Sequence, residues 1–142
     1  MTMGVTFRYT NSMENKVIKR IFVDMDGVLA DFNTGVENLT GRAFPNTDAG
    51  HNDYDERKEE LTNKRLFRNL PPMEDMYDLV AYIRHTGLPW EILTAAGVIN
   101  RELVVFDKNE WIREYVSPSV VVTCTMTGSQ KGMFAIKGSV LI

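Results

Sequence analysis

The chain has 142 residues, enough for one domain with a hydrophobic core. Its formal net charge of −3 argues against a general nucleic-acid-binding protein, whose affinity rests on a basic surface, and no apolar run approaches the ~20 residues of a membrane-spanning helix. With a single cysteine, Cys124, and no apolar leader segment, we expect a cytoplasmic protein without an internal disulfide.

Short apolar runs and helical patterns alternate along the chain after residues 1–16, which we interpret as an N-terminal extension. Apolar, β-branched runs predict strands, whereas periodic apolar positions and charged runs predict helices. The predicted strands are 17–25, 90–93, 120–124 and 140–142, and the predicted helices are 33–39, 54–68, a segment from 73 toward 87, and one that includes 108–115.

The predicted helix at 54–68 is highly charged, and it follows a polar stretch rich in Pro, Gly and Asn that predicts a loop. Asp53 and Arg57, like Glu60 and Lys64, lie four residues apart. Opposite charges at this spacing can pair on a helix surface. We therefore interpret the segment as a solvated helix stabilised by ion pairs.

Strands that alternate with helices favour an α/β fold, in which right-handed crossovers join parallel strands. Ligands bind such sheets at the carboxyl ends of the strands. Asp24 and Asp26 end the first predicted strand, Thr94 follows the second, and Lys131 lies just beyond the third. The sequence therefore predicts a polar site at this edge of the sheet.

The residue types at this edge suit phosphoryl transfer. Of two neighbouring carboxylates, one can act as a nucleophile while the other serves as general acid and base. A hard cation such as Mg²⁺ would relieve their repulsion and neutralise phosphate charge. Gly27 permits a sharp turn and a close backbone approach, Thr94 offers a hydroxyl, and Lys131 offers a positive charge.

Each of these positions also has a plainer structural interpretation. Two acids after a strand can form a turn or a helix cap. Thr94 can be a strand-end hydroxyl, Lys131 a solvated loop lysine, and Phe32 a core residue. The convergence of three positions on one sheet edge favours the functional interpretation.

These residues also carry a family resemblance. The segment 24–28, DMDGV, resembles the first motif of the haloacid dehalogenase superfamily, Thr94 in ILTAA resembles the second motif, and Lys131 resembles the third. The longer string DMDGVLADF, together with LFRNLPPME and KNEWIREYV, is similar to the 5′(3′)-deoxyribonucleotidases, including their bacterial and phage types. The resemblance extends over residues 21–142.

The resemblance implies a Rossmann-like core formed by 17–32 and 79–142, with a small helical cap, 33–78, inserted after the first strand. It implies Mg²⁺-dependent hydrolysis of (deoxy)nucleoside 5′-monophosphates through an aspartyl-phosphate intermediate. The expected partner is a small-molecule nucleotide or phosphate ester. Phe32 occupies the position where the family stacks an aromatic ring on the base, and Phe67 is expected to close over it.

The resemblance also implies roles for the polar residues. Asp24 would be the nucleophile and a metal ligand. Asp26 would be the general acid and base, and its backbone carbonyl would be a second metal ligand. Thr94 and Lys131 would hold the phosphate, with the backbone at Gly27 close to it.

One family feature lies where the sequence ends. The fourth motif of the family is an acidic pair directly after a strand like GSVLI, and the sequence stops at Ile142. We therefore expect a missing third carboxylate ligand, reduced activity, and self-association through the open flank of 140–142. Two alternatives stay open: a phosphatase for another small phosphate ester, and a non-catalytic nucleotide- or metal-binding protein.

Overall fold

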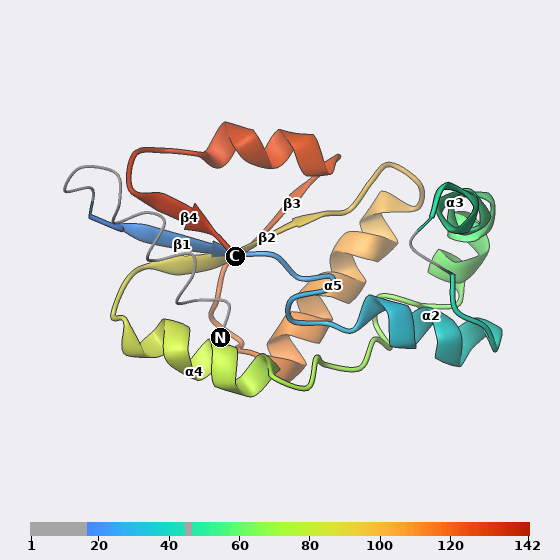
Figure 1. The fold of residues 1–142 in the computed structure, drawn as a ribbon, viewed down its shortest axis with the longest axis horizontal. Coiled ribbons are helices and arrows are strands. Elements are labelled where there is room, and N and C mark those ends of the chain that lie inside the picture. The colour runs from blue at the N-terminus through green and yellow to red at the C-terminus, as the bar shows by residue number, and fades with distance from the viewer. Residues whose placement is uncertain (1–16, 45–46) are drawn as a thin grey trace.

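The computed structural model describes residues 17–44 and 47–142, so the predicted N-terminal extension lies outside the described residues. The described chain forms a four-stranded sheet in the order β3-β2-β1-β4, and each neighbouring pair is parallel (Figure 1). The strands are β1 (Arg20–Val23), β2 (Trp90–Ala95), β3 (Val122–Thr125) and β4 (Ser139–Leu141). The predicted α/β class with a parallel sheet is confirmed.

Strand β1 lies inside the sheet, because it pairs with both β2 and β4. Ile21 lies opposite Trp90 of β2 on one side and opposite Val140 of β4 on the other. Ile21 and Val23 are both 0% exposed. Parallel strands covered on both faces read as continuous apolar runs, which explains the apolar sequence Ile-Phe-Val in this strand.

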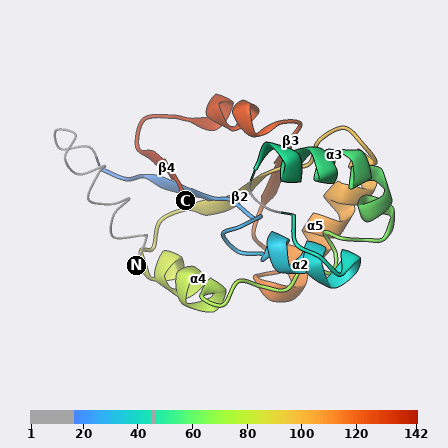
Figure 2. The same ribbon diagram turned by 45° about the vertical axis from the view of Figure 1, so that its right-hand side comes forward.

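The described helices surround this sheet on three sides. Helices α2 (Phe32–Thr40) and α3 (Asp48–Asn63) lie beyond the carboxyl ends of the strands, at the right of Figures 1 and 2. Helix α4 (Met76–His85) and the 3₁₀ helix η1 (Gly128–Phe134) lie on opposite sides of the sheet. Helix α5 (Arg101–Tyr115) connects β2 to β3. None of these helices combines the length and the apolar composition needed to cross a bilayer.

Helix α3 begins in the stretch that the sequence predicted as a loop. Thr47 precedes the helix, and its side chain accepts a hydrogen bond from the Gly50 N–H at 3.1 Å. Asp48 adds a negative charge to the first turn, where it interacts favourably with the helix dipole. Capping by these short polar residues therefore outweighs their turn propensity. The helix ends close to Arg65, whose positive φ of 64° is incompatible with a continuing helix.

Two other features also differ from the prediction, and they change where site residues lie. Strand β2 extends to Ala95, so Thr94 lies inside the strand and not after it. Lys131 lies in η1, where the sequence had suggested a loop. Helix α5, by contrast, includes the predicted segment 108–115 and begins at Arg101. Tertiary contacts set these ends, because the local patterns there are weak.

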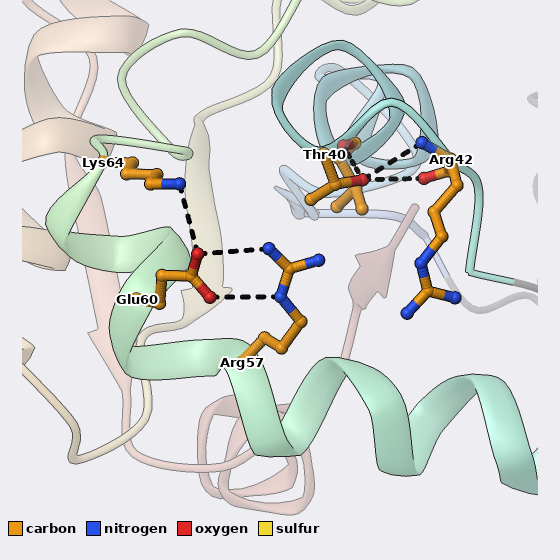
Figure 3. Close-up of polar contacts among 6 residues, drawn as sticks. Thr40, Arg42, Arg57, Glu60 and Lys64 are labelled. Atoms are coloured by element: carbon orange, nitrogen blue, oxygen red, sulfur yellow. Dashed lines mark hydrogen bonds and ion pairs between the residues drawn. The ribbon is translucent and has the colours of Figure 1, made fainter.

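The ion pairs of α3 are partly those that the spacing predicted (Figure 3). Lys64 Nζ lies 3.1 Å from Glu60 Oε1, which confirms the predicted pair. Arg57 donates through Nε and Nη2 to the same carboxylate, each at 3.1 Å, so its predicted pairing with Asp53 is wrong. Asp53 instead pairs with Arg42 at 3.4 Å. The hydrogen bonds from Arg57 and then Lys64 lower the pKa of Glu60 to about 2.

The end of α2 is closed by a polar turn, also drawn in Figure 3. Thr40 Oγ1 lies 2.8 Å from the carbonyl oxygens of both Val36 and Arg42, and its single proton can be donated to either of them. Gly41 follows with a φ of +80°, the left-handed conformation in which helices commonly end. This turn fixes the direction in which the chain leaves α2 toward α3.

The segment between α3 and α4 is docked on α5. The Arg65 guanidinium binds both oxygens of Asp107, whose side chain is only 2% exposed, through Nε at 3.0 and 2.8 Å and through Nη2. Trp111 is 0% exposed and donates from its indole N–H to the Leu70 carbonyl at 2.7 Å. Part of the predicted insertion, 33–78, is therefore held directly against the predicted core.

Candidate active site

Asp24 lies immediately beyond β1 and is held by its own chain and by η1. Its Oδ1 accepts a hydrogen bond from the Met25 N–H at 2.8 Å and lies 2.9 Å from Lys131 Nζ. The Asp24 N–H donates to the Ile142 carbonyl at 2.9 Å, which continues the pairing of β1 with β4. The Lys131 side chain is 12% exposed, so this carboxylate has a partly buried cation beside it.

Asp26 is held by a lysine that the sequence analysis did not single out. Lys108 on α5 is fully buried, and its ammonium donates to Asp26 Oδ2 at 3.1 Å, Thr94 Oγ1 at 2.8 Å and the Ala95 carbonyl at 2.7 Å. An ammonium has three N–H donors, and each has an acceptor here. The Phe67 ring lies 4.8 Å from the same nitrogen. These hydrogen bonds and the ring contact therefore offset the desolvation cost of burying this cation.

The second carboxylate oxygen of Asp26, Oδ1, has no such partner in the part of the chain that the structure describes. This oxygen is buried, and among the described residues no other buried side-chain oxygen or nitrogen lacks a hydrogen-bond partner. Leaving a buried acceptor unpaired is costly, and functional sites are a common reason for it. Asp26 also lines a cavity of about 750 Å³, so the unpaired oxygen belongs to a residue at the cavity wall.

A tight turn after β1 presents the two carboxylates. The N–H groups of Leu29 and Ala30 donate to the Met25 carbonyl, each at 2.9 Å, and the Gly27 N–H donates to the Ala30 carbonyl at 2.8 Å. Gly27 has a φ of +81°, which a side chain would strain. The predicted sharp turn is confirmed, and Gly27 lines the cavity.

Aromatic rings form one wall of the cavity. Phe32 packs edge-on against Tyr54, with ring centroids 5.2 Å apart, and lies 6.1 Å from the tilted Phe67 ring. Burial, and then the negative charge of Asp26, raise the pKa of the Tyr54 phenol, so Tyr54 keeps its proton. Phe32 and Phe67 therefore lie together at the cavity, although Phe67 is largely buried and already contacts Lys108.

The predicted site residues do not all meet the cavity in the same way. Lys108 ties Asp26 to Thr94, and Lys131 pairs with Asp24, so the structure gathers the predicted polar residues at one sheet edge. Asp24, Thr94 and Lys131 are nevertheless not among the residues that line the cavity. Thr94 is only 1% exposed, so its hydroxyl supports Lys108 in the structure as it stands.

Lys108 could have been found from a break in a helical pattern. Val104, Trp111 and Ile112 are buried at helical spacing along α5, and Lys108 occupies the same face. A lysine within an apolar helical stripe is unusual, because lysine is rarely buried unless it is paired. The pattern alone predicts a buried partner for it, although not which one.

The donor set at this edge is compatible with Mg²⁺. In the part of the chain that the structure describes, no group of three or more His, Cys, Asp or Glu side chains could hold a metal ion. Asp24 provides a carboxylate oxygen and Asp26 a backbone carbonyl oxygen, and Mg²⁺ prefers hard oxygen ligands of these types. Mg²⁺ is often held by one or two carboxylates and completes its shell with water and substrate phosphate. The residues present therefore fit such an ion.

Comparisons with known proteins add little to this geometry. The sequence matches no protein family model and no curated protein. Among solved structures, a hydrolase from Streptococcus pneumoniae TIGR4 is similar over 84% of this chain and 70% of its own, with 14% sequence identity and a TM-score of 0.34.

Proposed function

We propose that this protein is a Mg²⁺-dependent phosphatase that hydrolyses (deoxy)nucleoside 5′-monophosphates. One observation carries the proposal: two carboxylates at the carboxyl edge of a parallel sheet are each held by a separate lysine, and one of them keeps an unpaired buried oxygen beside a cavity. The family resemblance of residues 24–28 agrees with it.

In the proposed reaction Asp24 is the nucleophile. One of its oxygens attacks phosphorus, the new O–P bond forms, and the ester P–O bond breaks. Water then attacks the aspartyl phosphate, which releases inorganic phosphate and restores the carboxylate. A carboxylate needs no base to activate it, which suits a residue held by Lys131 and the Met25 N–H.

Asp26 carries the proton in this proposal. It donates a proton to the departing alcohol oxygen and later takes one from the attacking water. Lys108 engages Oδ2 and Oδ1 has no partner among the described residues, so the proposal assigns both transfers to Oδ1. Lys108 thus orients the acid without blocking the oxygen that reacts.

Charge on the phosphate is met by Lys131 in this proposal, and the Thr94 hydroxyl is a further donor close to the same edge. Bound Mg²⁺ would neutralise phosphate charge and reduce repulsion between the carboxylates. Asp24 and Asp26 are the residues that would hold it.

The cavity supports a substrate with a sizeable leaving group. Its volume of about 750 Å³ lies in the range of ~300–1,000 Å³ that small-molecule sites occupy. The Phe32 and Tyr54 rings in its wall suit a planar ring such as a nucleobase.

The direct test measures phosphate release, with and without Mg²⁺, from a panel of ribo- and deoxynucleoside 5′-monophosphates and simple sugar phosphates, with calorimetric binding in parallel. We expect Mg²⁺-dependent release that is faster for nucleotides. Faster release from sugar phosphates would mean that the protein is a phosphatase for another ester and not a nucleotidase. Nucleotide binding without release would indicate a non-catalytic binding protein.

Phe32→Ala should weaken the binding of a nucleoside monophosphate but hardly that of inorganic phosphate. Stacking on a base contributes ~1–3 kcal/mol, so the dissociation constant for the nucleotide should rise about tenfold to a hundredfold. Titration calorimetry with both ligands measures the difference. Phe106→Ala removes an exposed aromatic ring outside the cavity and serves as the control. Equal losses for both ligands in Phe32→Ala would mean that Phe32 is structural.

A further inference from the structure

One face of α3 borders the cavity. Tyr54, Lys58 and Thr62 follow one another at intervals of four residues, and all three line it. Residues at this spacing share one face of a helix. The helix therefore presents an ammonium group flanked, one turn to either side, by a phenol and an aliphatic hydroxyl. These groups can all donate hydrogen bonds to a ligand.

The charges around the cavity are unevenly partnered. Among the described residues that line it, only Asp26, Asp31 and Lys58 are charged. Asp26 has Lys108, and both oxygens of Asp31 accept from Thr34, one from the N–H at 3.1 Å and one from the hydroxyl at 2.7 Å. Each of these two carboxylates thus has a partner within the protein, through both oxygens of Asp31 and through Oδ2 of Asp26.

Lys58 is held much more loosely. Its ammonium lies 3.8 Å from an oxygen of Asp55, whose side chain is 65% exposed, and 5.5 Å from the centre of the Tyr54 ring. An ion pair at this distance and exposure contributes little. Lys58 is the one basic side chain among the described residues that line the cavity. The lysine beside the proposed nucleophile is Lys131, which comes from η1.

We propose that Lys58 recognises a second anionic group on the substrate, carried by the part that leaves when the phosphate is transferred. This inference rests on the proposed function and deepens it: the substrate is a phosphate ester whose leaving group bears a further phosphate or a carboxylate. In the proposed function Lys131 and Mg²⁺ would bind the reacting phosphate. Lys58 would therefore bind a group at the other end of the ligand. The hydroxyl groups of Tyr54 and Thr62 are placed to share that second anion.

The test compares three ligands by titration calorimetry without Mg²⁺, so that the proposed hydrolysis does not consume them: a nucleoside 5′-monophosphate, the matching 3′,5′-bisphosphate, and the 5′-monophosphate with a succinyl half-ester at the 3′ oxygen. A charge-assisted hydrogen bond at a partly exposed site should make the affinity for the two ligands with a second anionic group about tenfold higher than for the monophosphate. Comparing the bisphosphate with the succinyl half-ester shows whether the second group is a phosphate or a carboxylate. The preference should shrink as salt is raised.

Three variants locate the effect. Lys58→Met should bring all three ligands to the monophosphate affinity, and Lys58→Arg should keep most of the preference. Lys64→Met is the matched control, because Lys64 directly follows the last residue of the same helix, pairs with Glu60 and does not line the cavity. Helix content measured by circular dichroism verifies that each variant is folded.

Two results would overturn the inference while leaving the proposed function intact: equal affinity of the unsubstituted protein for all three ligands, or an unchanged preference in Lys58→Met. Failure of the proposed function looks different. In that case neither the monophosphate nor inorganic phosphate binds, and the recognition by Lys58 falls with it.

Discussion

Asp24→Asn is expected to reduce Mg²⁺-dependent phosphate release to the uncatalysed background, a loss of about 10⁴-fold or more. An amide oxygen cannot form the acyl phosphate that the proposed reaction requires. The fold should persist, because the Asn side-chain oxygen can still accept from the Met25 N–H. Loss of the ion pair to the partly buried Lys131 should cost about 1–2 kcal/mol of unfolding free energy. Steady-state phosphate release and chemical denaturation measure the two effects.

Asp78→Asn is the control for this experiment, since Asp78 is an exposed carboxylate on α4, away from the cavity. It should keep the activity of the unsubstituted protein and lose at most ~0.3–1 kcal/mol of stability, because Asp78 lies in the first turn of α4, where a negative charge interacts with the helix dipole. Phosphate release by Asp24→Asn within tenfold of the unsubstituted rate would remove Asp24 as the nucleophile, and the proposed mechanism would need another attacking group.

Lys108→Met should have the second-largest effect, because it removes a fully buried cation and leaves its three acceptors unpaired. Breaking a buried ion pair costs ~3–5 kcal/mol, and the 31% exposure of the Asp26 side chain reduces that to about 2–3 kcal/mol. For a domain of this size the melting temperature should fall by about 5–10 °C. Methionine fills a similar volume, so the loss reflects charge more than packing.

Lys108 acts on the proposed reaction by positioning Asp26, so Lys108→Met should also slow phosphate release by about 10²-fold, the lower end of general acid–base contributions. A double-mutant cycle with Asp26→Asn separates positioning from general stability. The double variant should recover part of the lost stability but none of the activity, with a coupling of about 1–3 kcal/mol. Lys64→Met, an exposed lysine, is the control. Additive losses of stability would show that Lys108 and Asp26 act independently.

Several features of the fold followed from local patterns in the sequence. The apolar run before Asp24 predicted a buried parallel strand, because a strand covered on both faces cannot tolerate polar side chains. Gly27 predicted the turn that presents the carboxylates, and its positive φ is the conformation that only glycine adopts without strain. The pair of Glu60 with Lys64 was also predictable, because both residues lie within two turns of one helix.

Other features depended on contacts that no local pattern encodes. Thr94 was expected to follow its strand, yet it lies inside β2, because pairing with β3 extends the strand to Ala95. Thr47 lies in a polar stretch that resembles a loop, and only its hydrogen bond to the Gly50 N–H reveals that a helix begins there. In both cases the local residues are compatible with more than one backbone conformation, and the contacts decide among them.

The candidate site shows the same division. The sequence by itself determined that Asp24, Asp26 and Lys131 would be near the carboxyl edge of a parallel sheet, because chain order and strand direction fix where each strand ends. Only the tertiary structure decided that Lys108 binds Asp26, a contact between residues 82 positions apart, and that Lys58 borders the cavity. The physical reason is that periodicity shows which side chains share a face, whereas the partner across a face depends on how helices pack, which is decided by the whole core.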